Sequence, residues 1–137
     1  MDFFILKIKN IIIFQKMDKE VSIRHDFERN LSKGFETFGD ICRILQFCFG
    51  FIYYTGGQII SDGQIKQKLF IRKDGFKYRF VISYIFDIYK PASNYQSVCI
   101  DYCFGFEQIK RVFLTFKIDK IKDLCKRIND NYDEYNK

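Results

Sequence analysis

Two Asp-Gly pairs, at residues 62–63 and 74–75, divide runs that are rich in β-branched and aromatic residues. A two-residue type I′ turn needs positive φ at both central positions, which Asp-Gly tolerates and most other pairs do not. Both pairs therefore predict tight turns that join three antiparallel strands. A Gly-Gly pair at residues 56–57 predicts a bulge in the first strand. The three predicted strands are residues 51–61, 64–73 and 76–89.

A two-residue turn at residues 74–75 sorts the side chains of its hairpin between two faces, because cross-strand partners share a face. It pairs Phe70 with Arg79, and a slip of one residue would destroy the sorting. The apolar face contains Ile65, Leu69, Ile71, Tyr78, Phe80, Ile82 and Tyr84, and the basic face contains Lys66, Lys68, Phe70, Arg72, Lys77 and Arg79. The turn at residues 62–63 pairs Ile60 with Ile65 and Tyr54 with Ile71, which places Tyr54 on the apolar face.

Positive charge is concentrated on this hairpin. Residues 64–79 hold six of the chain's 23 basic side chains but only one of its 17 acidic side chains, and so contribute five of the six net positive charges. A localised basic surface attracts polyanions more strongly than the same charge when it is scattered. The composition therefore predicts a binding surface for nucleic acid or for an acidic protein.

The N-terminal third predicts one strand and two helices. The β-branched residues of segment 2–16 favour a strand, although Met17 is an alternative start that would make residues 1–16 an over-extended reading frame. Ser22 can cap a helix over residues 22–33 that Gly34 closes. A second helix follows over residues 35–49, where apolar residues recur at helical spacing.

The C-terminal half predicts a loop at residues 89–96, strands at residues 97–104 and 110–117, and a helix from Asp119. Residues 133–137 are expected to fray. No repeat or low-complexity linker divides the chain, so residues 1–137 are predicted to form a single domain.

These elements predict an α+β fold, with a five- to six-stranded antiparallel meander sheet, two N-terminal helices and one C-terminal helix. Their order resembles the helix-grip fold of the plant pollen-allergen and lipid-transfer (START-like) superfamily. The resemblance is one of topology, and it implies a curved sheet that grips the last helix over a ligand cavity. Tyrosines on the apolar face would line such a cavity around a small apolar ligand. The candidate cavity residues are Tyr54, Tyr78, Tyr84 and Tyr102.

Catalytic and metal chemistry lack a sequence pattern. The single histidine, His25, has no nucleophile motif beside it. The five cysteines contain no C-x-x-C pair, and they are interpreted as buried thiols in a reducing cytoplasm. We therefore expect a cytoplasmic protein that is not an enzyme and that uses no metal or cofactor.

The function expected from these patterns is that of a small binding protein which engages a polyanion through the basic hairpin face, with Phe70 stacking on an unpaired base. Its size and composition suit a phage or mobile-element accessory protein. A solvated sheet face is the alternative interpretation of the same lysines. The alternative functions are a helix-grip carrier of a small apolar ligand, and an oligomerisation module in which Phe70, Val81 and Ile85 form one exposed patch.

Overall fold

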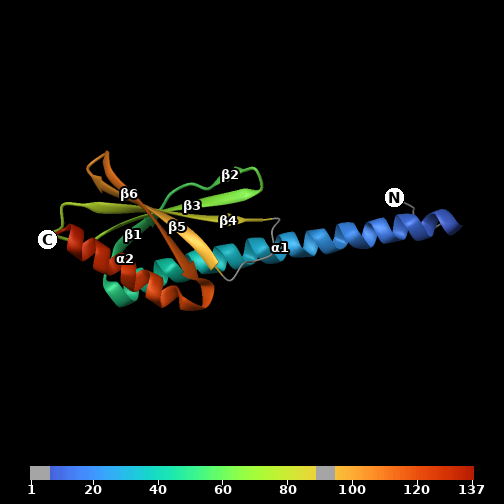
Figure 1. The fold of residues 1–137 in the computed structure, drawn as a ribbon, viewed down its shortest axis with the longest axis horizontal. Helices are drawn as coiled ribbons and strands as arrows, with labels where there is room; N and C mark the ends of the chain where they lie inside the picture. The colour runs from blue at the N-terminus through green and yellow to red at the C-terminus, as the bar shows by residue number, and fades with distance from the viewer. Residues whose placement is uncertain (1–6, 89–94) are drawn as a thin grey trace.

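The computed structural model describes residues 7–88 and 95–137, with side chains described from residue 28 onward. The described residues form an α+β domain in which six antiparallel strands build one sheet, and α1 and α2 lie on the same side of it (Figure 1). The predicted class is confirmed. The elements are α1 (Lys7–Phe49), β1 (Ile52–Thr55), β2 (Ile59–Ser61), β3 (Gln64–Arg72), β4 (Arg79–Asp87), β5 (Tyr95–Phe104), β6 (Glu107–Lys117), the 3-10 turn η1 (Ile118–Lys120) and α2 (Ile121–Tyr135).

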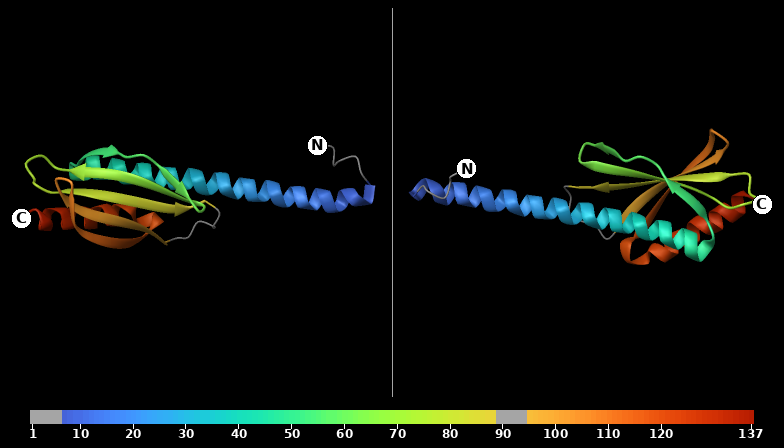
Figure 2. Two further views of the ribbon diagram at one scale, coloured as in Figure 1. Left: turned by 90° about the horizontal axis from the view of Figure 1, so that it is seen from above. Right: turned by 180° about the vertical axis from the view of Figure 1, so that it is seen from behind.

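The N-terminal third is one continuous helix, so the predicted pair of helices is wrong. The strand predicted at residues 2–16 is also wrong where the structure describes it, because residues 7–16 are helical. Residues 2–6 lie outside the described residues. Isoleucine has only a slightly lower helix propensity than straight-chain residues, so its abundance does not prevent a helix. In Figures 1 and 2 the N-terminal part of α1 extends well beyond the sheet.

The prediction that Gly34 ends a helix is wrong. Gly34 lies inside α1, where this helix crosses β4. A β-carbon at this position would overlap the ring of Phe86. The helix instead ends before Gly50, whose φ of 75° lies in the left-handed region that glycine adopts without steric cost. The N–H groups of Gly50 and Phe51 donate to the carbonyls of Gln46 and Leu45, at 3.1 and 3.0 Å. These bonds satisfy two carbonyls at the helix end.

The sheet has the order β1-β3-β4-β5-β6, with β2 also paired to β3. The turn at residues 62–63 has the predicted register, which pairs Ile60 with Ile65. Beyond the Gly-Gly pair at residues 56–57 the register changes by one residue, and Tyr54 pairs with Phe70. The predicted bulge is therefore confirmed, and it moves every side chain of β1 to the face opposite the predicted one.

The β3–β4 register differs from the predicted one by two residues, because Phe70 pairs with Val81 and not with Arg79. A shift by an even number leaves each side chain on its predicted face. Leu69, Phe80 and their neighbours on the apolar face are buried, which confirms the sorting. The chain turns at Asp74-Gly75 as predicted, and the N–H of Phe76 donates to the carbonyl of Lys73 at 3.3 Å. The predicted pairing beside this turn is wrong, because the strands pair only as far as Ile71 and Phe80.

A tyrosine of α2 explains this wider connection between the strands. The hydroxyl of Tyr132 accepts a hydrogen bond from the N–H of Lys73 (2.9 Å) and donates one to the carbonyl of Tyr78 (2.7 Å). The N–H of Tyr78 donates to Oδ1 of Asn136 at 3.0 Å. Helix α2 thus occupies backbone groups that a two-residue hairpin would have paired between the strands, Lys73 with Phe76 and Tyr78 with Ile71.

Helix α2 continues through Tyr135, so the first three residues of the tail predicted to fray, 133–137, are helical. The ring of Tyr135 lies 4.7 Å from the rings of both Tyr78 and Tyr102, between centroids. Aromatic burial offsets the tendency of a chain end to fray. The predicted C-terminal helix and the predicted strands at 97–104 and 110–117 are confirmed. Of the predicted loop at 89–96, residues 89–94 lie outside the described residues and the last two begin β5.

The core lies between the sheet and the two helices. It is rich in stacked and edge-on rings, such as Phe80 against Tyr102, with centroids 4.3 Å apart, and Phe51 against Tyr132, with centroids 5.0 Å apart. From α1 the core receives one stripe at helical spacing. Its buried members are Asn30, Gly34, Thr37, Phe38, Ile41, Cys42 and Leu45.

Candidate polyanion-binding face

The face of the sheet that points away from the helices carries most of the predicted binding residues. Lys66, Lys68, Phe70 and Arg72 alternate with buried residues along β3, and Arg79 begins β4. Same-face neighbours on a strand lie about 7 Å apart, so these cations form a short linear array. We call Lys66, Lys68, Arg72 and Arg79 the outer basic face.

Two lysines counted in the hairpin's charge lie elsewhere. Lys77 is exposed in the turn between β3 and β4. Lys73 turns toward α2, where its Nζ donates to Asn129 Oδ1 (2.5 Å) and pairs with Asp133 (3.2 Å). Its ammonium group also lies 4.7 Å from the ring centroid of Phe51. Lys73 therefore holds the turn against the helix and does not belong to the outer basic face.

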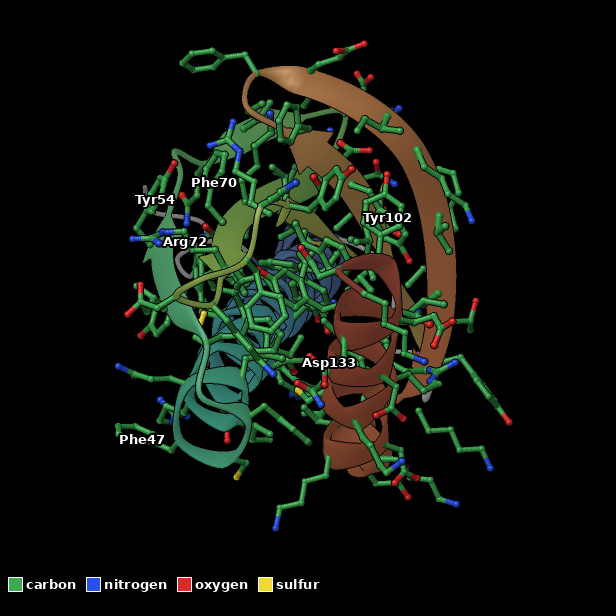
Figure 3. All side chains as sticks on the ribbon, turned by 90° about the vertical axis from the view of Figure 1, so that its left-hand side faces the viewer. Phe47, Tyr54, Phe70, Arg72, Tyr102 and Asp133 are labelled. Carbon is green, nitrogen blue, oxygen red and sulfur yellow. The ribbon has the colours of Figure 1, made fainter. Side chains whose placement is uncertain are left out.

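Tyr54 lies on this outer face, which corrects its predicted place in a cavity. Its ring stacks on Phe70, with centroids 4.6 Å apart and planes 8° from parallel. Figure 3 shows the two residues together with Arg72 at one side of the sheet, and Tyr102 on the other side, near α2. The side chain of Tyr54 remains 59% exposed. The Gly-Gly pair at residues 56–57 is the sequence feature that could have indicated this placement, because a one-residue change of register there moves the side chains of β1 to the opposite face.

Phe70 is only partly exposed, whereas the predicted stacking on an unpaired base needs an accessible ring face. Tyr54 stacks against it, the guanidinium carbon of Arg79 lies 6.0 Å from its centroid, and a β-carbon on Gly56 would approach within 2.9 Å of its ring. The same guanidinium lies 5.8 Å from the centroid of Phe106, in the β5–β6 turn. We call Tyr54, Phe70, Arg79 and Phe106 the stacked row. Its two terminal rings are exposed, and Phe106 is 101% exposed.

The charges around the stacked row are mostly uncompensated. Among the described residues, neither Lys68 nor Arg79 lies within ion-pair distance of an acidic group, and the Nε of Arg79 is buried without a hydrogen-bond partner. Arg72 pairs with Asp74 at 3.3 Å, but both side chains are more than half exposed, and such pairs contribute little. The outer basic face is therefore electrostatically open to an anion.

Beside this face, Asp101 of β5 pairs with Arg111 of β6, with Oδ1 2.6 Å from Nε. The hydrogen bond to Asp101 raises the pKa of Arg111. Cys99 and Cys103 flank Asp101 on the same strand face, and both are buried, as predicted for the thiols. Burial raises the pKa of both thiols, so both remain protonated near neutral pH.

The other candidate cavity residues lie on the inner side of the sheet but contact neighbouring rings. Tyr102 stacks on Phe80, and Tyr78 lies against Tyr135. Tyr84 donates to the Oε1 of Gln96, and burial raises its pKa to about 12. Side chains thus occupy the space beneath the sheet that a helix-grip fold gives to a ligand.

A half-open hollow of about 430 Å³ lies where α1 crosses the ends of β4 and β5. Asn30 and Gly34 line it from the helix, and Ile85 and Phe113 line it from the outer side of the sheet. Ile85 therefore faces this hollow at one end of β4, while Phe70 and Val81 pair toward the other end. Phe70, Val81 and Ile85 all lie on the outer face, and of the three only Ile85 is exposed.

Among the residues whose side chains are described, no group of three or more potential metal ligands is found. Within residues 7–88 and 95–137, none of the helices combines the length and apolarity needed to cross a bilayer. Comparison with family models, with curated proteins and with solved structures finds no match for this chain.

Proposed function

We propose that this protein is a binding module that engages nucleic acid through its outer basic face. The observation that carries the proposal is the environment of Arg79, whose guanidinium lies between two aromatic rings with no acidic partner among the described residues. A partly buried charge without a counter-charge favours binding of an anion. The array of Lys66, Lys68 and Arg72 on β3 supplies further cations.

The pattern favours nucleic acid over an acidic protein because cations and exposed rings alternate on one surface. Phosphates pair with lysine and arginine, and every base offers a flat face for stacking. A carboxylate-rich protein surface would use the cations but not the exposed rings of Tyr54 and Phe106. We therefore rank an acidic protein second, and the binding experiment separates the two.

The test is fluorescence anisotropy with labelled DNA and RNA oligonucleotides of mixed sequence, both single-stranded and duplex, from about 50 to about 200 mM salt. Four phosphate contacts predict that log K falls with log salt with a slope of about −3 for single strands. The absence of binding, or an affinity that salt does not weaken, would overturn the proposal. Direct binding of a labelled polyglutamate peptide, with no binding of the oligonucleotides, would support the acidic-protein alternative.

The double variant Lys68→Glu, Arg72→Glu should abolish binding while the protein remains folded, because both side chains project from the outer face of β3. The matched control is the double variant Lys120→Glu, Lys122→Glu, at two exposed positions near the start of α2, which changes the net charge by the same four units on a different element. Circular dichroism should show the same unfolding transition for all three proteins. If the control loses as much affinity as the β3 double variant, net charge and not the outer basic face determines binding.

A further inference from the structure

We infer that the stacked row selects single-stranded nucleic acid, with an unpaired base stacking on the exposed ring of Tyr54. This inference rests on the proposed function and adds the class of nucleic acid. The row runs across the sheet from β1 to the β5–β6 turn, so its four groups come from elements far apart in the sequence. Only the folded sheet brings them together.

Phe70, the inner ring of the row, has a neighbour on each side. Phe70 lies between Tyr54 and Arg79, and Arg79 lies between Phe70 and Phe106. A ligand ring therefore has access only at the ends, where Tyr54 is 59% exposed and Phe106 is 101% exposed. The nearly parallel packing of Tyr54 on Phe70 fixes the orientation of the Tyr54 ring before a base arrives, which reduces the entropy lost on binding.

Duplex bases cannot use these ring faces, because they are already stacked on one another. An unpaired base gains stacking at Tyr54 while its phosphates lie within reach of Lys68 and Arg72, the same-face neighbours of Phe70 along β3. Backbone charge alone would favour the duplex, whose charge density is higher. A preference for single strands is therefore the specific signature of stacking at this row.

The experiment compares single-stranded and duplex oligonucleotides, as DNA and as RNA, with Tyr54→Ala, Tyr54→Phe and the control Phe47→Ala. Phe47 is 78% exposed on α1, well separated from Tyr54 in Figure 3. Tyr54→Ala should weaken single-strand binding by about 5- to 150-fold, while Tyr54→Phe and Phe47→Ala should leave it unchanged. The salt slope should stay the same for Tyr54→Ala, because no cation is removed.

A 2-aminopurine base in the single strand provides a readout that a purely structural role of Tyr54 would not change. Stacking should quench its fluorescence on binding to the wild type, and Tyr54→Ala should lose this quenching even when it is saturated with DNA. Equal affinity for duplex and single strand, with Tyr54→Ala unaffected, would overturn this inference and leave the proposed function standing. Absence of salt-dependent binding to every oligonucleotide would overturn the proposed function itself. A preference for RNA over DNA would keep the inference and add recognition of the 2′-hydroxyl.

Discussion

Gly34 of α1 lies directly against the ring of Phe86 of β4, with no space for a β-carbon between them. The contact sets how closely the long helix approaches the sheet. Phe86 cannot easily move away, because it is buried and packs edge-on against Phe35, with ring centroids 5.7 Å apart. A glycine inside a helix costs about 1 kcal/mol relative to alanine, and close packing compensates for that cost here.

Gly34→Ala is therefore expected to destabilise the protein by about 1–3 kcal/mol, the usual range for overpacking a core. Gly39→Ala is the matched control in the same helix. A β-carbon there meets only the flexible end of Arg43, at 3.3 Å. The control should gain up to about 1 kcal/mol from helix propensity. Urea denaturation of both variants measures the difference in unfolding free energy. A Gly34→Ala variant as stable as the Gly39→Ala variant would contradict this account of the contact.

Local patterns in the sequence predicted the strands after residue 50, the facing of β3 and β4, and the C-terminal helix. They predicted the wrong β3–β4 register because the Tyr132 hydroxyl, which widens the connection between the strands, comes from more than fifty residues away. They misplaced Tyr54 because a Gly-Gly pair indicates a bulge but not how many residues it shifts. Gly34 was assigned to a helix end for a similar reason. A glycine that allows close packing and one that ends a helix look the same in sequence, and only tertiary contacts distinguish them.

The candidate site shows the same division between local and tertiary information. The cations of β3 were predictable, because strand periodicity assigns them to one face. The contact of Phe70 with Tyr54 was not, since the predicted register placed Tyr54 on the opposite face of the sheet. Phe106 could not be recognised either, because nothing local to the β5–β6 turn indicates that its ring lies near Arg79.

Tyr132→Phe should destabilise the protein by about 1–3 kcal/mol, since it leaves the N–H of Lys73 and the carbonyl of Tyr78 without their partner. The ring contacts of Tyr132 would be preserved. Tyr135→Phe is the control on the same helix, because its ring packs but its hydroxyl makes no hydrogen bond shown in the described structure. Its effect should be close to zero. Urea titration should show an unchanged m-value for both variants, and equal stability of the two would argue against the bridging hydroxyl.

Thiol reactivity should distinguish Cys48 from the other four cysteines. Cys48 is exposed on α1, whereas Cys42, Cys99, Cys103 and Cys125 are buried. Burial also raises the pKa of Cys42 to about 11 and that of Cys125 to about 12. Because the thiolate is the reactive form, one thiol should react rapidly with an aromatic disulfide reagent at pH ~8.

Cys48→Ser should remove the rapid phase, and denaturant should expose all the thiols of the wild type. Two or more rapid equivalents in the native protein would show that the sheet or the helix interface opens more readily than the packing indicates.

Stability should fall at alkaline pH because of Tyr84. Burial raises its pKa to about 12 in the folded protein, whereas an unfolded tyrosine has a pKa of about 10. The folded state therefore binds the proton more tightly, and the contribution of Tyr84 to stability is constant below pH ~10 and falls as pH rises toward ~12. A difference of about two pKa units corresponds to a loss of about 2–3 kcal/mol over this range.

The buried thiols of Cys42 and Cys125 contribute a loss of the same sign, which begins near pH ~9, so Tyr84 must be isolated by difference. Tyr84→Phe should be less stable than the wild type at pH ~8, because it loses the hydrogen bond to Gln96. The difference in unfolding free energy between the two proteins should then shrink as pH rises from ~10 to ~12, because only the wild type must bury an ionising phenol. Urea denaturation at several pH values measures this difference. A gap that stays constant across the range would mean that Tyr84 ionises in the folded protein as easily as in the unfolded chain, which its burial between the sheet and α1 does not allow.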